Sequence, residues 1–306
     1  MSVYLANRVL RMIPVLFAVV TLVFLMLHMI PGDPARVVLG DEATEEDVAA
    51  FRAQLGLDQP LGAQYARFLS GLARGDMGRS YVTGRPVLLD AFERFRFTML
   101  LASASLVVAA VVGVLLGIPA GARPYSAMSA LIMVLALLGV SIPAFWLGLL
   151  LMLVFSLSLG WLPVAGTGTW QHLVLPTLTL STWSLGVIAR MTRASVADTM
   201  RSDFVRTARA KGLHERVVVY KHAFRNALIP VITVIGLRFG YMLGGAVATE
   251  TVFNWPGLGR FIVGAILARD YPSVQAGILI FSVSFLAINL VVDLTYALAD
   301  PRITYD

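Results

Sequence analysis

Long apolar runs dominate this chain and restrict the structures that it can form. The 306 residues are 58% hydrophobic and only 14% charged. A soluble protein of this length would need more charge on its surface. Several runs reach the ~20 residues that a membrane-spanning helix requires. The sequence therefore predicts an all-α integral membrane protein.

Six spans account for the apolar runs and leave both termini on the cytoplasmic side. The expected spans are residues 9–30, 97–118, 127–159, 173–189, 227–249 and 274–298. The third run contains Pro143, and we predict one kinked helix there. Two short spans instead would place the basic loop described below on the outer side, opposite to Arg8 and Arg11. The expected parts are residues 1–30, residues 31–96 and a core of residues 97–306.

Residues 31–96 form the longest polar segment, and we expect them to be a small helical extracytoplasmic segment. The preceding apolar run is longer than the ~7–15-residue core of a signal peptide, and no Ala-x-Ala cleavage site follows it, so we expect the first helix to be retained. Thr44 and Asp47 have the spacing of a capping box before a helix that ends near Leu55. A second amphipathic helix is expected over residues 61–72.

A strongly basic segment separates the fourth and fifth spans. Residues 190–225 contain nine Lys or Arg residues against three acidic ones. Because Lys and Arg are retained in cytoplasmic loops, this segment predicts the orientation of the chain. Its pattern from Asp203 is helical and ends at Gly212. We interpret residues 194–226 as a cytoplasmic loop that contacts another protein, and the concentration of charge there does not indicate a nucleic-acid partner.

The chain lacks the motifs of several site classes. Neither Lys211 nor Lys221 follows a glycine, so the sequence has no Walker-type ATP site. It has no His-Glu-x-x-His and no cysteine, and its four histidines lack ligand spacing. Ser141 precedes Ile142 and Pro143, which favours a helix-breaking serine over a nucleophile. We therefore expect no catalytic residue, no metal and no cofactor on this chain.

Three charged residues within or beside the spans are candidates for the translocation pathway or a gate: Arg238, Glu250 and Asp293. Charges at membrane depth usually face protein or water. Arg238 is about eleven residues into the fifth span, and snorkelling or pairing is the alternative to lining the pathway. For Asp293 the alternative is an interfacial carboxylate near the cytoplasmic headgroups.

The basic loop resembles the conserved cytoplasmic loop of ABC importer permeases. The resemblance lies in Ala208-Arg-Ala-Lys-Gly212-Leu and His222-Ala-Phe-Arg-Asn-Ala-Leu-Ile-Pro230. The full chain is similar to the first (B-type) permease of the dipeptide, oligopeptide and nickel importers. Further matching motifs are Ile30-Pro-Gly-Asp-Pro34, Leu55-Gly-Leu-Asp-Gln-Pro-Leu61, Gly75-Asp-Met-Gly-Arg-Ser80, Glu250-Thr-Val-Phe-Asn-Trp-Pro-Gly-Leu-Gly259 and Asp300-Pro-Arg302.

The chain departs from the general pattern of that loop at three positions. One of them is Arg225, where the pattern has proline and where the nearest proline of this chain is Pro230. Arg206 and Thr207 stand where the pattern has Glu and Ala, so a contact that relies on the glutamate charge is in doubt. The resemblance implies that the loop couples the chain to an ATPase. The implied coupling residues are Asp203, Arg206, Thr207, Ala208, Arg209, Ala210, Lys211, Gly212 and Leu213.

The resemblance also implies a type I ABC importer fold and a set of partners. These are a second, similar permease, two ATPase subunits that hold ATP and Mg, an extracytoplasmic binding protein that delivers substrate, and the lipid bilayer of a prokaryotic inner membrane. Dipeptides or short oligopeptides are the expected substrates. Glutathione, nickel chelates and oligosaccharides are alternatives within the resemblance. A secondary transporter or channel is the alternative outside it, and a membrane-embedded enzyme finds no support in the residues.

Overall fold

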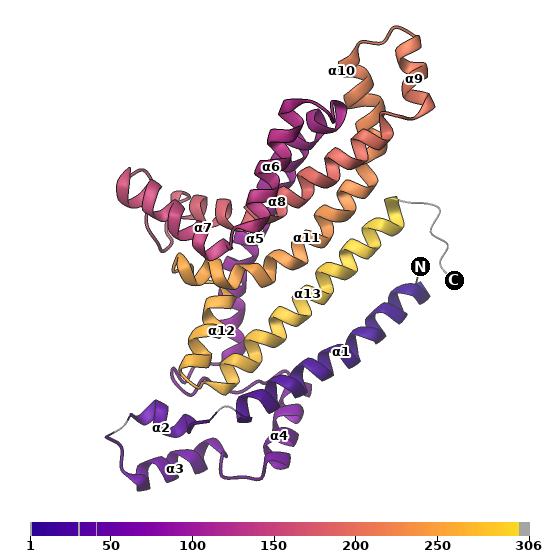
Figure 1. Ribbon diagram of the computed structural model, residues 1–306. Helices are drawn as coiled ribbons and strands as arrows, with labels where there is room; N and C mark the ends of the chain where they lie inside the picture. The colour runs from indigo at the N-terminus through magenta and orange to yellow at the C-terminus, as the bar shows by residue number, and fades with distance from the viewer. Residues whose placement is uncertain (1, 30, 41, 300–306) are drawn as a thin grey trace. The chain divides into compact units, whose positions relative to one another are not determined.

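The structure is a computed structural model that describes residues 2–29, 31–40 and 42–299, with the side chains of residues 8, 10–29, 31–40 and 42–292. Within these ranges the regular elements are helices, and the one isolated bridge pairs Arg79 with Pro86. The expected all-α fold is confirmed (Figure 1). The α-helices are α1 (Ser2–Met29), α2 (Pro34–Leu39), α3 (Glu45–Leu55), α4 (Leu61–Ala73), α5 (Val87–Ala122), α6 (Ala127–Ser141), α7 (Ala144–Leu151), α8 (Gln171–Thr199), α9 (Asp203–Ala210), α10 (Glu215–Val217), α11 (Phe224–Val252), α12 (Leu258–Leu267) and α13 (Tyr271–Ala299), and the π-helical segments are η1 (Met152–Ser158) and η2 (Val218–Ala223).

Five helical stretches in the described part of the chain are long and apolar enough to cross a membrane. They belong to α1, α5, α8, α11 with the two short helices before it, and α13. The pair of α6 with α7 and η1 gives a sixth span if it is counted as one. By length and composition, the six predicted spans are thus matched when the bent pair is counted as one span.

The third predicted span is broken more sharply than a proline kink. Its two halves meet at 104° (Figure 1). Pro143 has no N–H to continue the helical ladder, and the Ser141 hydroxyl donates to the Leu137 carbonyl at 2.9 Å. Ser141 therefore has the local backbone-bonding role that the sequence predicted.

The sequence located the helix ends less well than the helices themselves. α5 begins at Val87, ten residues before the apolar run, and α8 continues to Thr199, ten residues past it. The segment between the fifth and sixth predicted spans, residues 250–273, contains α12. Helices extend beyond the part that hydropathy detects, because polar residues also support the backbone ladder where the helix leaves the membrane.

The chain divides into two compact units, which we describe separately. Unit 1 comprises Met1–Phe97 and Pro256–Leu286, and unit 2 comprises Thr98–Trp255 and Ala287–Asp306. In unit 1, α4, α5, α12 and α13 surround a core whose buried members are Met77, Val87, Ala91, Leu258, Ala276 and Ile280.

A buried carboxylate ties the irregular part of unit 1 to α13. Asp270 is 4% exposed, and its side chain accepts hydrogen bonds from Ser80 Oγ at 2.5 Å, Tyr81 N at 3.0 Å and Ser273 Oγ at 2.7 Å. A buried charged group of this kind is tolerated only when its oxygens are satisfied. Asp270 therefore fixes the loop after residue 79 against the first turn of α13.

The capping box before α3 is present as predicted. Thr44 Oγ1 accepts from Asp47 N at 3.2 Å, and Thr44 N donates to Asp47 Oδ2 at 3.3 Å. The helix ends at Gly56, whose φ of +69° is the left-handed conformation that glycine adopts without penalty. The second predicted helix is α4.

Unit 2 is organised around α8, which packs against α6, α7 and α11. Three glycines spaced four residues apart on α5 allow that helix to approach α8 closely. A Cβ at Gly113, Gly117 or Gly121 would lie 2.9 Å or less from atoms of Ile188, Thr192 or Arg193. Small residues at this spacing are a common interface between membrane helices, and our reading of the sequence missed this stripe.

Candidate functional site

The basic segment of unit 2 forms a short helix between the ends of two long ones. Figure 1 shows α9 and α10 at one end of the α8–α11 pair. The helix predicted from Asp203 is confirmed and ends at Ala210. Gly212 then adopts a φ of +75°, and the chain turns towards α10. This is the left-handed conformation expected just after a helix.

Two small apolar residues hold α9 against the rest of unit 2. Val205 and Ala208 are buried in one cluster with Val218 and Ala223 of η2. Their spacing of three residues places them on the same face of the helix. Because η2 leads directly into α11, this contact connects α9 to a long helix without an intervening loop.

The remainder of the predicted coupling segment is exposed. Phe204 also exposes 44% of its surface, and Leu213 exposes 39%. We name these exposed residues the coupling surface: Asp203, Phe204, Arg206, Thr207, Arg209, Ala210, Lys211, Gly212 and Leu213. Ala208 is the one predicted coupling residue that lies on the buried face instead. The sequence analysis missed Phe204, although an aromatic residue beside a basic cluster is itself a sign of an interface.

An ion pair closes the turn over Gly212. Arg209 donates through Nε to Glu215 Oε2 at 3.1 Å and through Nη2 to Glu215 Oε1 at 2.7 Å. This two-pronged geometry fixes the direction of the turn more than it adds stability, since both side chains are about half exposed. A Cβ added to Gly212 would meet no atom of the chain within 4 Å. The turn therefore presents open backbone to any neighbouring protein.

Arg206 stands where the general pattern of the family's loop has glutamate. Its Nη1 lies 3.5 Å from Asp203 Oδ1, one turn earlier on α9. Both side chains are largely exposed, so the pair contributes little to stability. The guanidinium remains available to an acidic partner.

A cavity of about 470 Å³ lies beside this turn within unit 2. The end of α5 forms one wall, and α10 and η2 form another. Its lining is Ile118, Pro119, Ala122, Arg123, Met128, His214, Glu215, Arg216, Val219 and Tyr220. Arg123, just after α5, and Arg216 of α10 thus line this cavity together with His214, Glu215 and six largely apolar residues.

Arg238 is held by aromatic rings. Its guanidinium carbon lies 4.7 Å from the centre of the Trp183 ring and 5.1 Å from that of Tyr241. Its Nε is buried and has no hydrogen-bond partner among the described residues. Cation–π contacts of this kind stabilise a charge at membrane depth while leaving its donors unused.

Glu250 is fully buried and does not lie near Arg238. The two residues are twelve positions apart on α11, which is about 18 Å of helix. Glu250 accepts a hydrogen bond from Thr98 Oγ1 at 2.5 Å, and its carbonyl accepts from Trp255 N at 2.8 Å. The side chain of Asp293 lies outside the described residues. The structure thus places Arg238 and Glu250 at separate positions, and a role for any of the three in the pathway stays a prediction.

Comparison with known proteins relates both halves of the chain to one class of transporter. Residues 113–305 match the family described as "Binding-protein-dependent transport system inner membrane component". Residues 1–102 match the N-terminal component of such membrane proteins. The chain is 50% identical to the glutathione transport system permease protein GsiC of Escherichia coli K12, and 49% identical to GsiC of Salmonella paratyphi A. Both alignments cover 99% of this chain and 99% of the relative.

Proposed function

Because this chain belongs to the binding-protein-dependent inner-membrane permeases of ABC importers, we propose that it forms half of the translocation pathway of a glutathione importer. The observation that carries the proposal is an identity of about one half to glutathione permeases over 99% of both chains. The sequence predicted dipeptides or short oligopeptides as substrates, with glutathione as an alternative. Glutathione is a tripeptide, and it is now the proposed substrate. Membership of this family decides against the alternative of a secondary transporter or channel.

As a member of this family, the chain is a multi-pass inner-membrane transport subunit without a catalytic site of its own. ATP is bound by the partner ATPase of such a system. Among the described residues, no group of three His, Cys, Asp or Glu residues is placed to hold a metal ion. The chain therefore acts by binding its partners and by changing conformation.

We propose that the coupling surface is the contact with the ATPase. The exposed Phe204 and Leu213 provide apolar area there, while Arg206 and Lys211 favour an acidic partner. The open backbone at Gly212 permits close approach. A displacement of α9 would pass through Val205 and Ala208 to η2 and from there into α11. Short π-helical segments are frequent at functional sites, which agrees with this route.

The proposed assembly contains a second permease of the same family, two ATPase subunits and an extracytoplasmic binding protein. In this arrangement residues 31–96 and the segment of residues 250–270 face the binding protein. Crosslinking from single cysteines in these two segments tests the contact. The absence of crosslinks at every position in both segments would contradict it.

We further propose that the coupling surface is cytoplasmic and that residues 31–96 are outside. The chain has no cysteine, so single cysteines at Glu46 and Arg216 report each side cleanly. Both side chains are exposed. A membrane-impermeant thiol reagent should label the Glu46→Cys variant in intact cells and the Arg216→Cys variant only after lysis. The reverse labelling would contradict this orientation.

Uptake by the complete transporter in proteoliposomes tests the substrate. We expect ATP-dependent accumulation of radiolabelled glutathione that requires the binding protein. Unlabelled dipeptides, nickel chelates and oligosaccharides, added in turn as competitors, separate the alternatives. Accumulation of one of these compounds without any accumulation of glutathione would overturn the proposed substrate.

A further inference from the structure

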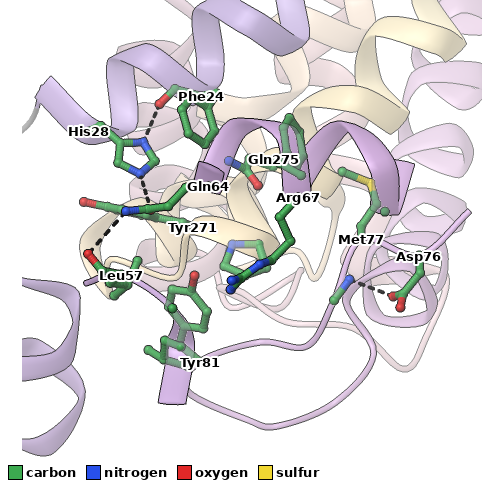
Figure 2. Close-up of a pocket in the computed structure, with 16 residues that line it drawn as sticks. Phe24, His28, Leu57, Gln64, Arg67, Asp76, Met77, Tyr81, Tyr271 and Gln275 are labelled. Carbon is green, nitrogen blue, oxygen red and sulfur yellow. Dashed lines mark hydrogen bonds between the residues drawn. The ribbon is translucent and has the colours of Figure 1, made fainter. Parts of the chain in front are cut away.

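A second cavity, of about 290 Å³, lies within unit 1 (Figure 2). Its walls come from the end of α1, the segment after α3, α4, the loop before α5 and the first turn of α13. Its lining is Phe24, His28, Leu55, Gly56, Leu57, Gln64, Arg67, Phe68, Gly71, Asp76, Met77, Gly78, Tyr81, Tyr271, Pro272 and Gln275. The volume is near the lower end of the ~300–1,000 Å³ that is usual for small-molecule sites.

One wall of this cavity is fixed by its own hydrogen bonds. His28 Nδ1 lies 2.8 Å from the Phe24 carbonyl, and its Nε2 lies 3.1 Å from Gln64 Oε1. Gln64 Nε2 donates to the carbonyls of Leu57 and Gln59 at 3.2 and 2.8 Å. Both ends of the Gln64 amide thus have partners within the chain, which fixes the position of this side chain in the wall.

On the opposite side the polar groups make no hydrogen bond to the described part of the chain. Arg67 is exposed and Tyr81 and Gln275 are half-buried, so water satisfies these groups and a ligand would replace that water. Within the described residues the Arg67 guanidinium has no ion-pair partner, and the Tyr81 hydroxyl and the Gln275 amide have no hydrogen-bond partner. Burial, and then the charge of Asp270, raise the pKa of Tyr81, so its hydroxyl remains a neutral donor. Three polar side chains thus line one cavity with free hydrogen-bonding capacity.

A carboxylate, that of Asp76, also lines the cavity. Asp76 Oδ1 accepts from Gly78 N at 2.8 Å, and its carboxylate makes no ion pair among the residues that the structure describes. Figure 2 shows the Arg67 side chain extending from α4 into the group of labelled residues, with Tyr81 on one side and Asp76 on the other in that view. The rings of Phe24 and Phe68, whose centres are 5.9 Å apart, add an apolar wall.

From this arrangement we infer that the cavity of unit 1 binds a small zwitterionic peptide, with Arg67 on a carboxylate and Asp76 on the ammonium group. The planar guanidinium fork matches a carboxylate. Tyr81 and Gln275 provide hydrogen bonds to the peptide groups between the two charges. The inference rests on the proposed function, because glutathione is the peptide that the proposed importer delivers to the cavity. It assigns unit 1 a substrate-binding site made of residues other than Arg238, Glu250 and Asp293.

The tip of the Arg67 side chain packs closely against the backbone of Gly56. A Cβ added to Gly56 would lie 2.0 Å from Arg67 Nη1. Only glycine at residue 56 therefore permits the observed placement of this side chain. Gly56 also adopts a φ of +69°, so the helix end and the placement of Arg67 depend on the same residue.

The test measures equilibrium binding of radiolabelled glutathione to the full chain in lipid nanodiscs, without the binding protein. We expect saturable binding that Arg67→Gln and Asp76→Asn each weaken about ten-fold or more, as charge-assisted hydrogen bonds are lost. Asparagine at residue 76 keeps the acceptor for Gly78 N, so the turn is preserved. Arg74→Gln removes the same charge from the end of α4, at a position that is exposed, as Arg67 is, but that does not line the cavity. It should leave binding unchanged.

Two modified forms of glutathione test which ligand group binds to Arg67 and which binds to Asp76. Glutathione diethyl ester should bind weakly to the wild type and no more weakly to Arg67→Gln. N-acetyl glutathione should behave in the same way with Asp76→Asn. The absence of glutathione binding to the wild-type chain, or equal binding by the Arg67→Gln and Arg74→Gln variants, would overturn the site. ATP-driven uptake by the complete transporter tests the proposed function independently, since uptake without this binding retains the function and rejects the site.

Discussion

Two glycines end short helices in different regions of this molecule, and their surroundings differ completely. Gly56 follows α3 and Gly212 follows α9, with φ values of +69° and +75°. An added Cβ at residue 56 would meet the Arg67 side chain at 2.0 Å, whereas one at residue 212 would meet nothing within 4 Å. The same backbone solution is used once to place a side chain of the chain itself and once to leave a surface open.

The regions around these two glycines also differ in how firmly the rest of the chain holds them. The irregular part of unit 1 is fixed by a buried carboxylate with hydrogen bonds from three groups. The coupling segment is held by two small apolar residues and a half-exposed ion pair. A cavity requires fixed walls, whereas a docking segment needs an anchored inner face and a free outer face. The four predictions that follow test this contrast, from the largest expected effect to the smallest.

Gly212→Asp should give the largest effect, and it should affect transport rather than folding. A charge would be forced against the proposed interface, so we expect uptake to fall about ten-fold or more. The amount of ATPase that is recovered with the variant in pull-downs should fall as well. Aspartate at the positive φ of residue 212 costs at most about 1–2 kcal/mol, and the space around it is open within this chain. The abundance of the variant in the membrane should therefore remain near that of the wild type. Wild-type uptake with normal ATPase recovery would remove Gly212 from the coupling mechanism.

Asp270→Ala should destabilise unit 1. The substitution leaves Ser80, Tyr81 N and Ser273 without their acceptor, at roughly 1–3 kcal/mol for each buried group left unsatisfied. Thermal unfolding of the purified chain in detergent should show a lowered midpoint. The unfolding midpoint of Asp270→Asn should lie between those of the wild type and Asp270→Ala, because the serine hydroxyls can rotate to bond with the amide. An unchanged midpoint for Asp270→Ala would show that this network does not stabilise the unit.

Gly56→Ala and Gly212→Ala compare the two helix ends directly. Each places a Cβ at positive φ, which costs about 1–2 kcal/mol, so the two midpoints should fall by similar amounts. The tip of Arg67 can swing away from the new methyl group, so glutathione binding in nanodiscs should weaken in Gly56→Ala alone. Equal binding by the two variants would contradict the role assigned to Gly56.

Arg209→Gln should have the smallest effect on stability. Exposed ion pairs contribute about 0–1 kcal/mol, and their contribution is screened by salt. The difference in unfolding midpoint from the wild type should therefore shrink when NaCl is raised. A difference of several degrees that persists at high salt would show that the Arg209–Glu215 pair is a structural requirement of the turn.

The extent of sequence prediction can be judged from particular residues. Thr44 and Asp47 predicted the capping box, and Gly212 predicted the end of α9, because both depend on neighbours within a few residues. The burial of Ala208 was not predicted. It requires η2 to fold against α9, and nothing within α9 reports that contact. The contact of Arg238 with Trp183 was also missed, since the two residues are 55 positions apart in the chain.

The sequence by itself determined the membrane class, the approximate spans, the small helices outside them and the resemblance to importer permeases. These properties follow from hydropathy, local capping and ordered motifs, which are written in consecutive residues. Only the tertiary structure decided how sharply the chain breaks at Pro143, that the glycines of α5 meet α8, and that Arg67, Asp76 and Tyr81 line one cavity. The angle at Pro143 depends on how its two helices pack. The contact of α5 with α8, and the cavity that Phe24 and Tyr271 complete, depend on residues distant in the chain, where steric fit and the pairing of polar groups decide which side chains meet.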